Sequence, residues 1–424
     1  MTTSTTSAVC PFAFPFPPDD DPTAPPAVPT SGESSRVVPI ALPDRPDGRP
    51  ADLVGSSSAA WYVTGYELVR RVLRETETFS REHGDDVHPY LRLSPLIMGW
   101  DGEHHRALRS LVAREFTPRR IALQRPVLEA LTDRLLDAMA ASGEPADLVE
   151  ALAMPLSLHA VGEVLQTPEE DRGRFRQWGD MFISTGPDRA REAETALREM
   201  TAYVARRMER LGDRDDSALA RTLQAADERG IDHAEAALLV SSMVTAAWET
   251  TAGALSCLLY KLLTTTWDGT LLYRHLCLTP DAIPGTIHET LRTVPNGTLE
   301  TAQPRRAMRD VELDGVQVRA GDIVVPAIDQ ADRDPDVWDD PDRYDITRTP
   351  RPLLTFGHGP HVCLGEHLAV LELNVAVERL TTRFPALRLA APPTEITWNA
   401  ATTVRRPLAL PVTWSSPATS QKTR

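Results

Sequence analysis

The chain has 424 residues, of which 42% are hydrophobic and 25% are charged, a composition typical of a soluble globular protein. Its net charge of −15 argues against non-specific binding to nucleic acid or to an anionic membrane, and four cysteines are too few for a disulfide scaffold. The N-terminus lacks the pattern of a signal peptide, and no apolar run reaches the roughly 20 residues of a membrane span. We therefore expect a cytoplasmic protein.

Both ends of the chain have a composition typical of disorder. Pro, Ser, Thr and Asp dominate residues 1–36, which predicts an extended or disordered arm. Residues 416–424 have the same character and are predicted to form a disordered tail. Length alone suggests two or three domains, but the long helix described next favours a single domain over residues 37–415.

The middle of the chain is predicted to be helical, because Ala, Leu, Arg and Glu recur there with helical periodicity. We expect helices over 121–142, ended by Gly143, and over 190–211, ended by Gly212. A third helix, over 233–266, would be about 50 Å long at about 1.5 Å per residue. It is apolar nearly all round, which predicts that it runs through the protein centre.

Predicted strands are short and lie outside this helical region. Residues 59–69 have a β-rich beginning, and residues 311–328 contain β-branched runs that are interrupted by Asp-Gly and Ala-Gly-Asp. Residues 387–393 and 405–414 are candidates for another small sheet. The expected fold class is mainly α with small β-sheets.

The clearest chemical signal lies in residues 354–369, LTFGHGPHVCLGEHLA. Cys363 lies among Gly357, Gly359 and Gly365, just before a strong helical pattern. A helix N-terminus stabilises a thiolate, and glycines let backbone N–H groups approach the sulfur. Three interpretations are open: a structural cysteine, a zinc site with neighbouring histidines, which matches no common zinc spacing, or a thiolate ligand of haem iron.

The stretch from Phe356 to Gly365, Phe-Gly-x-Gly-x-His-x-Cys-x-Gly, resembles the haem-binding loop of the cytochrome P450 family. The resemblance implies the cytochrome P450 fold, with haem b between a long central helix and the helix after the cysteine. It implies that Cys363 is the axial ligand, with further haem contacts from Phe356, Gly357, His361 and Gly365.

Further motifs extend the resemblance along the chain. Glu289 and Arg292 resemble the family's Glu-x-x-Arg pair, and Arg348 stands where the family has a later arginine that locks this region. The resemblance gives these three residues structural roles. His105 and Arg109 resemble the His-x-x-x-Arg helix that binds a haem propionate, and their i, i+4 spacing puts both on one helix face.

The remaining propionate contacts are also implied by the resemblance. Arg305 stands where a propionate arginine is expected, with Arg306 as a close rival. His361 would serve the second propionate. His104 adjoins His105, and only the spacing to Arg109 favours His105 as the propionate ligand.

Residues 246–251, AAWETT, resemble the family's oxygen-activating motif on the long helix. There an acid and an alcohol, here Glu249 and Thr250, relay protons to iron-bound dioxygen. The alternative for Thr250 is a hydroxyl that satisfies a helical carbonyl. Ala247 replaces the family's usual Gly, and its methyl group would narrow the oxygen groove.

A substrate pocket is expected beside the haem. One helix face carries Met243, Ala246, Ala247 and Thr250 at i, i+3, i+4 and i+7, and we assign it to this pocket and to the haem. Asn296 and Thr298 are expected to line the pocket as well. Their polarity favours a substrate with hydrogen-bonding groups, such as a peptide-derived or aromatic natural-product intermediate.

The resemblance implies a monooxygenase that hydroxylates a small organic substrate with O₂. Electrons would come from a ferredoxin and its NAD(P)H-dependent reductase, which could dock on Arg106, Arg114, Arg119 and Arg120. We also expect a monomer. Oxidative cyclisation or C–C or C–N coupling without oxygen insertion is one alternative, and a non-catalytic haem sensor and a peroxide-using enzyme are others.

Overall fold

The computed structural model describes residues 12–13, 21–28, 36–41, 60–82, 97–164, 168, 171–182, 190–212, 215–295, 304–399 and 404–415. The chain divides into two compact units, each of which is described by itself. Unit 1 comprises residues 1–111, 292–344 and 351–363, and unit 2 comprises residues 112–291, 345–350 and 364–424. Both units therefore draw on segments that are far apart in the sequence.

Unit 1 is built on a six-stranded sheet. Its strand order is β1 (Phe12–Ala13), β2 (Val37–Ala41), β3 (Ala60–Val63), β11 (Ile323–Pro326), β8 (Arg305–Ala307) and β4 (Phe79–Ser80). The β1–β2 and β11–β3 pairs are parallel, and the other pairs are antiparallel. Part of the predicted arm over residues 1–36 is thus a strand of this sheet.

The elements around the sheet complete unit 1. Helix α1 (Tyr66–Arg74) follows β3, and Val69 and Val72 from this helix are fully buried in the core of the unit. Strands β9 (Val311–Leu313) and β10 (Val316–Val318) form the hairpin that the Asp-Gly pair predicts, with positive φ at Asp314 and Gly315. The short helices are η2 (Ile97–Gly99), α12 (Ile328–Ala331) and η9 (Gly359–His361).

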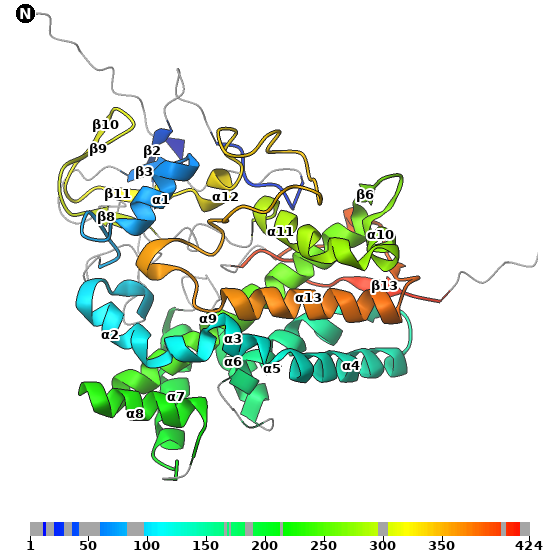
Figure 1. Ribbon diagram of the computed structural model, residues 1–424, viewed down its shortest axis with the longest axis horizontal. Coiled ribbons are helices and arrows are strands. Elements are labelled where there is room, and N and C mark those ends of the chain that lie inside the picture. The colour runs from blue at the N-terminus through cyan, green and yellow to red at the C-terminus, as the bar shows by residue number, and fades with distance from the viewer. Residues whose placement is uncertain are drawn as a thin grey trace, which may run out of the picture. The chain divides into compact units, whose positions relative to one another are not determined.

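Unit 2 is mostly helical (Figure 1). Its helices are η3 (Ala113–Phe116), α3 (Pro118–Ala122), α4 (Arg125–Ser142), η4 (Val149–Ala153), α5 (Met154–Val164), α6 (Arg172–Phe182), α7 (Ala190–Met208), α8 (Ala218–Arg229), α9 (His233–Thr264), α10 (Leu272–Leu278), η7 (Pro280–Ala282), α13 (Glu366–Arg383) and η10 (Pro393–Glu395). Two helices cross a unit boundary, α2 (Gly102–Val112) and α11 (Ile283–Thr293).

Helix α9 is the central element of unit 2 and packs against α5, α6, α7, α8, α10 and α13. The Asp232 side chain caps its N-terminus by accepting a hydrogen bond from the backbone N–H of Ala234. The helix ends at Thr264, two residues before the predicted end. Thr266–Trp267 (β6) instead pairs with Thr270–Leu271 (β7) around an Asp-Gly turn, where a β-branched threonine favours strand over helix.

The predicted helix over 121–142 is divided into α3 and α4. Pro126 lacks a backbone N–H and occupies the first turn of α4, a position where proline is tolerated and a new helix begins. Gly143, with φ of 85°, ends α4 as expected. A small sheet with the order β12 (Arg388–Leu389), β13 (Pro411–Thr413) and β5 (Ala146–Asp147) includes both predicted C-terminal strand segments.

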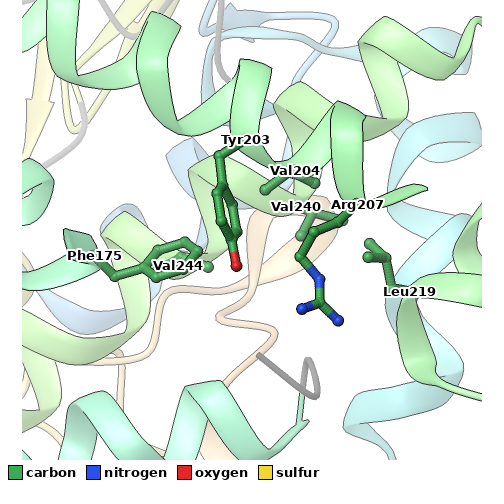
Figure 2. Close-up of a pocket in the computed structure, with 7 residues that line it drawn as sticks. All are labelled: Phe175, Tyr203, Val204, Arg207, Leu219, Val240 and Val244. Atoms are coloured by element: carbon green, nitrogen blue, oxygen red, sulfur yellow. The ribbon is translucent and has the colours of Figure 1, made fainter. Parts of the chain in front are cut away.

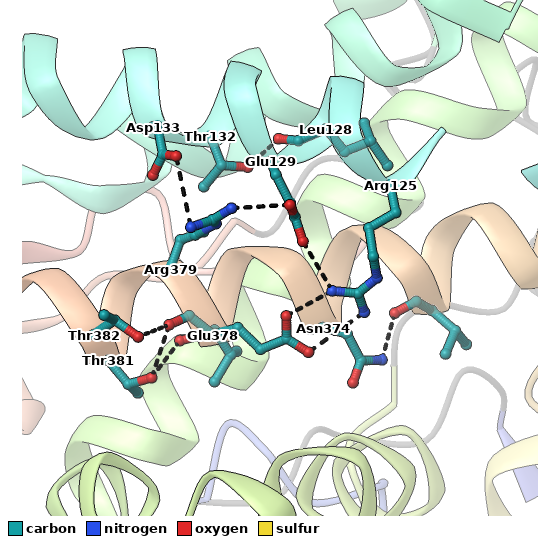
Figure 3. A network of polar contacts seen from close by, with 12 residues as sticks. Arg125, Leu128, Glu129, Thr132, Asp133, Asn374, Glu378, Arg379, Thr381 and Thr382 are labelled. Carbon is teal, nitrogen blue, oxygen red and sulfur yellow. Dashed lines mark hydrogen bonds and ion pairs between the residues drawn. The ribbon is translucent and has the colours of Figure 1, made fainter. Parts of the chain in front are cut away.

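Helix α13 begins three residues after Cys363 and lies beside α4 (Figure 1). A network of ion pairs joins the two helices (Figure 3). Arg125 Nη1 lies 2.8 Å from Glu378 Oε2 and 3.2 Å from Glu129 Oε1, and Arg379 Nη2 lies 2.9 Å from Glu129 Oε2. The network fixes the register of α13 on α4, although each half-exposed pair contributes only about 0–1 kcal/mol.

Candidate functional site

The loop before Cys363 has a tightly bonded backbone within unit 1. The N–H of Gly357 donates to Leu354 O (2.7 Å), and the N–H of Cys363 donates to Phe356 O (2.7 Å). Gly359 has φ of 73°, and a Cβ there would lie 2.8 Å from Arg74 Cα, so no other residue fits. The loop thereby presents an exposed Cys363 thiol.

Imidazole and guanidinium groups gather near this thiol. His361 Nε2 is hydrogen-bonded to Asp101 Oδ1 (2.8 Å), and its ring lies against that of His105, with 4.1 Å between centroids and a tilt of 36° between the planes. Arg109 Nη2 donates to Val362 O (2.6 Å), next to Cys363. His105 is buried, whereas His104 is exposed and contacts Trp100 edge-on. The histidine that the spacing to Arg109 favours, His105, is therefore the one that faces inward.

Two further arginines of this cluster are fully buried. Arg305 on β8 is 0% exposed, whereas its rival Arg306 is only partly buried. Arg81, which follows β4, is 1% exposed, and its backbone N–H donates to Asp101 Oδ2 (2.6 Å). Sequence reasoning missed Arg81 and Asp101, because neither belongs to a spaced motif.

Burial and mutual contacts shift the pKa values of the groups in this cluster. Burial, with a contribution from nearby Arg305, lowers the pKa of Arg81 well below its ordinary value. Burial also lowers the pKa of Arg305 to about 10 and that of His105 to about 4. Burial alone would raise the pKa of Asp101, but hydrogen bonds from His361, Arg81 and Ser80 outweigh it and hold that pKa at about 2. The two buried guanidinium groups of Arg81 and Arg305, with the carboxylate of Asp101 beside them, form a site suited to further negative charge.

Within unit 2, one stripe of α9 is not buried. Ala246 is exposed and Met243, Ala247 and Thr250 are partly exposed, while Val244, Thr245 and residues 251–259 are buried. The Thr250 hydroxyl donates to Ala246 O (2.7 Å). The predicted face is therefore the open face of the helix.

Glu249 faces the other way. It is 0% exposed, and its Oε1 accepts from Arg406 Nε at 3.1 Å. Trp248 is also buried at 1% exposure. The acid and the alcohol of the predicted pair thus lie on different faces of α9, as expected for consecutive helical residues.

The predicted Glu-x-x-Arg residues are also buried. Glu289 Oε1 lies 3.5 Å from Arg348 Nε and accepts from the backbone N–H of Asp345 (2.9 Å). Arg292, in unit 1, donates from Nη1 to Asp332 O (3.0 Å) and stacks over Trp338 at 5.2 Å. Each residue fixes the backbone of the segment it contacts.

Comparisons with known proteins identify the family. The cytochrome P450 family profile matches residues 283–410. The mycinamicin IV hydroxylase/epoxidase of Micromonospora griseorubida is 36% identical over 360 residues, which cover 84% of this chain and 89% of that protein. The chain belongs to the cytochrome P450 family.

Two other relatives place this P450 among bacterial enzymes. The nocardicin C N-oxygenase of Nocardia uniformis subsp. tsuyamanensis is 36% identical over 362 residues, or 84% of this chain and 89% of that protein. The crystal structure of the LnmA cytochrome P450 hydroxylase of the leinamycin pathway, from Streptomyces atroolivaceus S-140, has a TM-score of 0.79 and 34% identity. That match covers 95% of this chain and 100% of LnmA, which confirms the predicted fold class.

The cofactor of a P450 is haem with a cysteine thiolate ligand, and the residues of unit 1 fit it. A haem brings two propionate carboxylates; buried Arg81 and Arg305 would supply the complementary charge, and His105 a hydrogen bond. The His105 Nδ1 is buried and has no hydrogen-bond partner among the described residues. Cys363 would ligate the iron, which activates dioxygen. In the described part of the chain, no three His, Cys, Asp or Glu side chains are placed to hold a metal ion, as the zinc alternative would require.

The described cavity is small. It lies in unit 2 among α6, α7, α8 and α9 (Figure 2) and is lined by Phe175, Tyr203, Val204, Arg207, Leu219, Val240 and Val244. It has room for about one water molecule, so it is too small for an organic substrate. The predicted pocket residues Asn296 and Thr298 lie outside the described residues.

Within the described ranges, no helix combines the length and apolar character that a membrane crossing requires.

Proposed function

We propose that this P450 inserts oxygen into a natural-product intermediate that carries hydrogen-bonding groups. The observation that supports this most is the exposed Cys363 thiol beside a buried cationic cluster that suits haem propionates. The relatives named above, a hydroxylase/epoxidase and an N-oxygenase, support a substrate of this class. Haem b would be held by Cys363, with Phe356, Gly357 and Gly365 from the loop and His105, Arg109, Arg305 and His361 from the cluster.

On α9, Thr250 would hold the water that delivers protons, and Glu249 would resupply them. The Thr250 hydroxyl already donates to Ala246 O, so its lone pairs can accept a hydrogen bond from a water molecule on the open face. The methyl group of Ala247 would narrow the oxygen groove along the same helix face. Met243, Ala246 and Ala247, together with Asn296 and Thr298, would contact the substrate.

Electrons would come from an acidic ferredoxin and its reductase, delivered to a monomeric cytoplasmic enzyme. Within unit 2, Arg114, Arg119 and Arg120 are exposed, and Leu123 is 73% exposed one turn from Arg119. An apolar side chain among cations is a suitable anchor for an acidic partner. Arg120 Nε also pairs with Glu115 Oε2 at 2.9 Å, so Arg119 is the cleaner residue to reverse.

Salt-dependent kinetics test this docking. Arg119→Glu should lower ferredoxin-driven turnover most at low salt, where charge attraction is least screened. Arg229→Glu, at the C-terminal end of α8, is the matched charge reversal and should leave the rate unchanged. Equal rates for Arg119→Glu and the parent enzyme at every salt concentration would reject this surface.

A library screen tests the reaction and the substrate class. Candidate intermediates are screened for a shift in haem spin state, and the binders are incubated with ferredoxin, reductase and NADPH. A product heavier by one oxygen atom supports the proposal. A product that has lost two hydrogen atoms would indicate the coupling alternative, and spectral binding without NADPH-dependent turnover would indicate a sensor.

A further inference from the structure

Asp332, the residue after α12, holds the beginning of the Cys363 loop (residues 354–363). Its Oδ1 accepts from the N–H of Leu354 (2.8 Å), and its Oδ2 accepts from the N–H groups of Leu354 (3.0 Å) and Thr355 (2.8 Å). These residues all belong to unit 1, although Asp332 and Leu354 are 22 residues apart in the sequence. One side chain thus fixes two consecutive peptide groups at the start of the loop.

The loop's own hydrogen bonds extend this constraint towards Cys363. Leu354 O accepts from Gly357 N–H and Phe356 O accepts from Cys363 N–H, each at 2.7 Å. Leu354 itself is 1% exposed and packs in the core of unit 1. Because these short bonds connect the start of the loop with its turn and with the cysteine, the direction of the thiol depends on where the first two residues are held.

The Asp332 carboxylate depends on the same contacts. Asp332 is 1% exposed, and the N–H groups of Leu354 and Thr355 are the only hydrogen-bond donors to its carboxylate among the described residues. A buried carboxylate needs donors or a cation in place of its lost hydration. The carboxylate and the loop therefore hold each other in place. Arg292 completes the anchor by donating from Nη1 to Asp332 O (3.0 Å).

Charged and titratable groups face the Asp332 carboxyl from α11, α12 and α1. Arg292 on α11 lowers its pKa, Asp329 on α12 raises it, and Tyr66 on α1 is a phenol whose own pKa is raised by burial and by Asp332. Burial has the largest effect and raises the Asp332 pKa to about 7, against the loop hydrogen bonds and Arg292. A proton on the carboxyl turns one accepting oxygen into a donor, so it weakens the contacts to the loop.

We infer that Asp332 is a positioning residue for the haem ligand, whose carboxylate holds the beginning of the Cys363 loop so that the thiol keeps the direction needed to ligate iron. This inference rests on the proposed role of Cys363 as the axial ligand. In this scheme Asp332 contacts neither haem nor substrate and acts only through the backbone of the loop. Asparagine would replace it only in part, because an amide offers one oxygen and its NH₂ group would face a peptide N–H.

Asp322 offers a matched control in the same unit. It is 4% exposed, and its Oδ2 accepts from Arg319 N–H (2.9 Å) and from Trp61 Nε1 (2.8 Å). Like Asp332 it is a buried aspartate that accepts from a peptide N–H, but neither of these partners belongs to the Cys363 loop. Comparing Asp322→Asn with Asp332→Asn therefore separates loss of the loop anchor from the general cost of removing a buried carboxylate.

Hydrogen exchange and the carbon monoxide spectrum of the purified holoenzyme test the inference together. Exchange of the peptide N–H groups of residues 353–357 should be faster in Asp332→Asn and should match the parent in Asp322→Asn. The red-shifted Soret band of the reduced carbon monoxide complex should convert to the band of the form without thiolate about tenfold faster in Asp332→Asn, since a hydrogen bond to a charged group is lost. Asp332→Ala, which leaves no acceptor, should convert faster still.

The pH profile distinguishes this role from a purely structural one. In the parent, conversion should accelerate as the pH falls from about 8 to about 6, because the Asp332 carboxyl takes up its proton over that range. Asp332→Asn should convert at one rate throughout the same range. The two histidines of the cationic cluster do not account for such a change, because the pKa of His105 is about 4 and that of His361 is about 3.

The inference is overturned if Asp332→Asn converts at the parent rate, if it keeps the parent's pH dependence, or if Asp322→Asn converts as fast as Asp332→Asn. Failure of the proposed function gives a different result, because the parent protein would then lack the red-shifted band altogether. Should both Asp332 variants fail to fold, hydrogen exchange in the parent gives the test. Corrected for its intrinsic pH dependence, exchange at residues 353–357 should quicken over the same fall in pH, and exchange that does not quicken overturns the inference as well.

Discussion

Two glycines on α6 predict opposite effects of the same substitution. Gly179 is buried, and a Cβ there would overlap the Trp248 indole: it would lie 2.5 Å from Cζ2, 2.7 Å from Cε2 and closer still to Nε1. Gly173, on the same helix, is exposed, and a Cβ there would have no neighbour within 4 Å. Only at Gly179 does the added methyl group overlap a packed ring.

The magnitudes follow from this difference. Replacing a helical Gly by Ala favours folding by about 0.5–1 kcal/mol, and both substitutions share this gain. Overpacking a filled core costs about 1–3 kcal/mol, and only Gly179→Ala incurs that cost. The free energies of unfolding of the two variants should therefore differ by about 1–3 kcal/mol, with Gly173→Ala the more stable.

Denaturant unfolding of the holoenzyme, followed by circular dichroism, measures this difference. Gly173→Ala should unfold at a slightly higher denaturant concentration than the parent, and Gly179→Ala at a clearly lower one. The reasoning is refuted if the two variants shift by the same amount. Equal upward shifts would show that the Trp248 ring moves aside without cost.

Three further predictions concern the site and its support. Asp101→Asn should lower the free energy of unfolding of the haem-free protein by about 1–2 kcal/mol at pH 7, because the Asp101 pKa of about 2 lies below the ordinary 3.8. A carboxyl group whose pKa is lowered in the folded state stabilises the fold above about pH 3.8. The difference in free energy of unfolding between Asp101→Asn and the parent should therefore disappear as the pH falls from 3.8 to about 2. A difference that is independent of pH would contradict this. Thr250→Ala should divert reducing equivalents to peroxide while Thr250→Ser stays coupled, as measured by product formed per NADPH; equal coupling in both would favour the purely structural hydroxyl. Arg379→Ala should cost no more than about 1 kcal/mol in thermal or denaturant unfolding, since its pairs with Glu129 and Asp133 are half-exposed, and a larger loss would mean that the network between α4 and α13 is cooperative.

Residues in long local patterns could be predicted from the sequence. The glycines around Cys363 predict a loop, and the hydrogen bonds of its backbone are local. The long apolar run predicts α9, which ends two residues before its predicted end. The open stripe from Met243 to Thr250 follows from helical spacing alone.

The residues that were missed depend on distant contacts. Arg81 is a single arginine after a two-residue strand, and nothing nearby in the sequence indicates that it is buried against Asp101. Glu249 was expected to act beside Thr250, but its partner Arg406 comes from a segment 157 residues away. Tertiary packing determines such pairs, and one sequence does not reveal them.

The carbon monoxide spectrum of the reduced protein tests the central claim most directly. A thiolate from Cys363 predicts a strongly red-shifted Soret band in the parent and its loss in Cys363→Ala. The band should persist in Arg406→Gln and Thr250→Ala, whose changes do not touch the ligand. Absence of the band from the folded parent protein, or its survival in Cys363→Ala, would contradict the account.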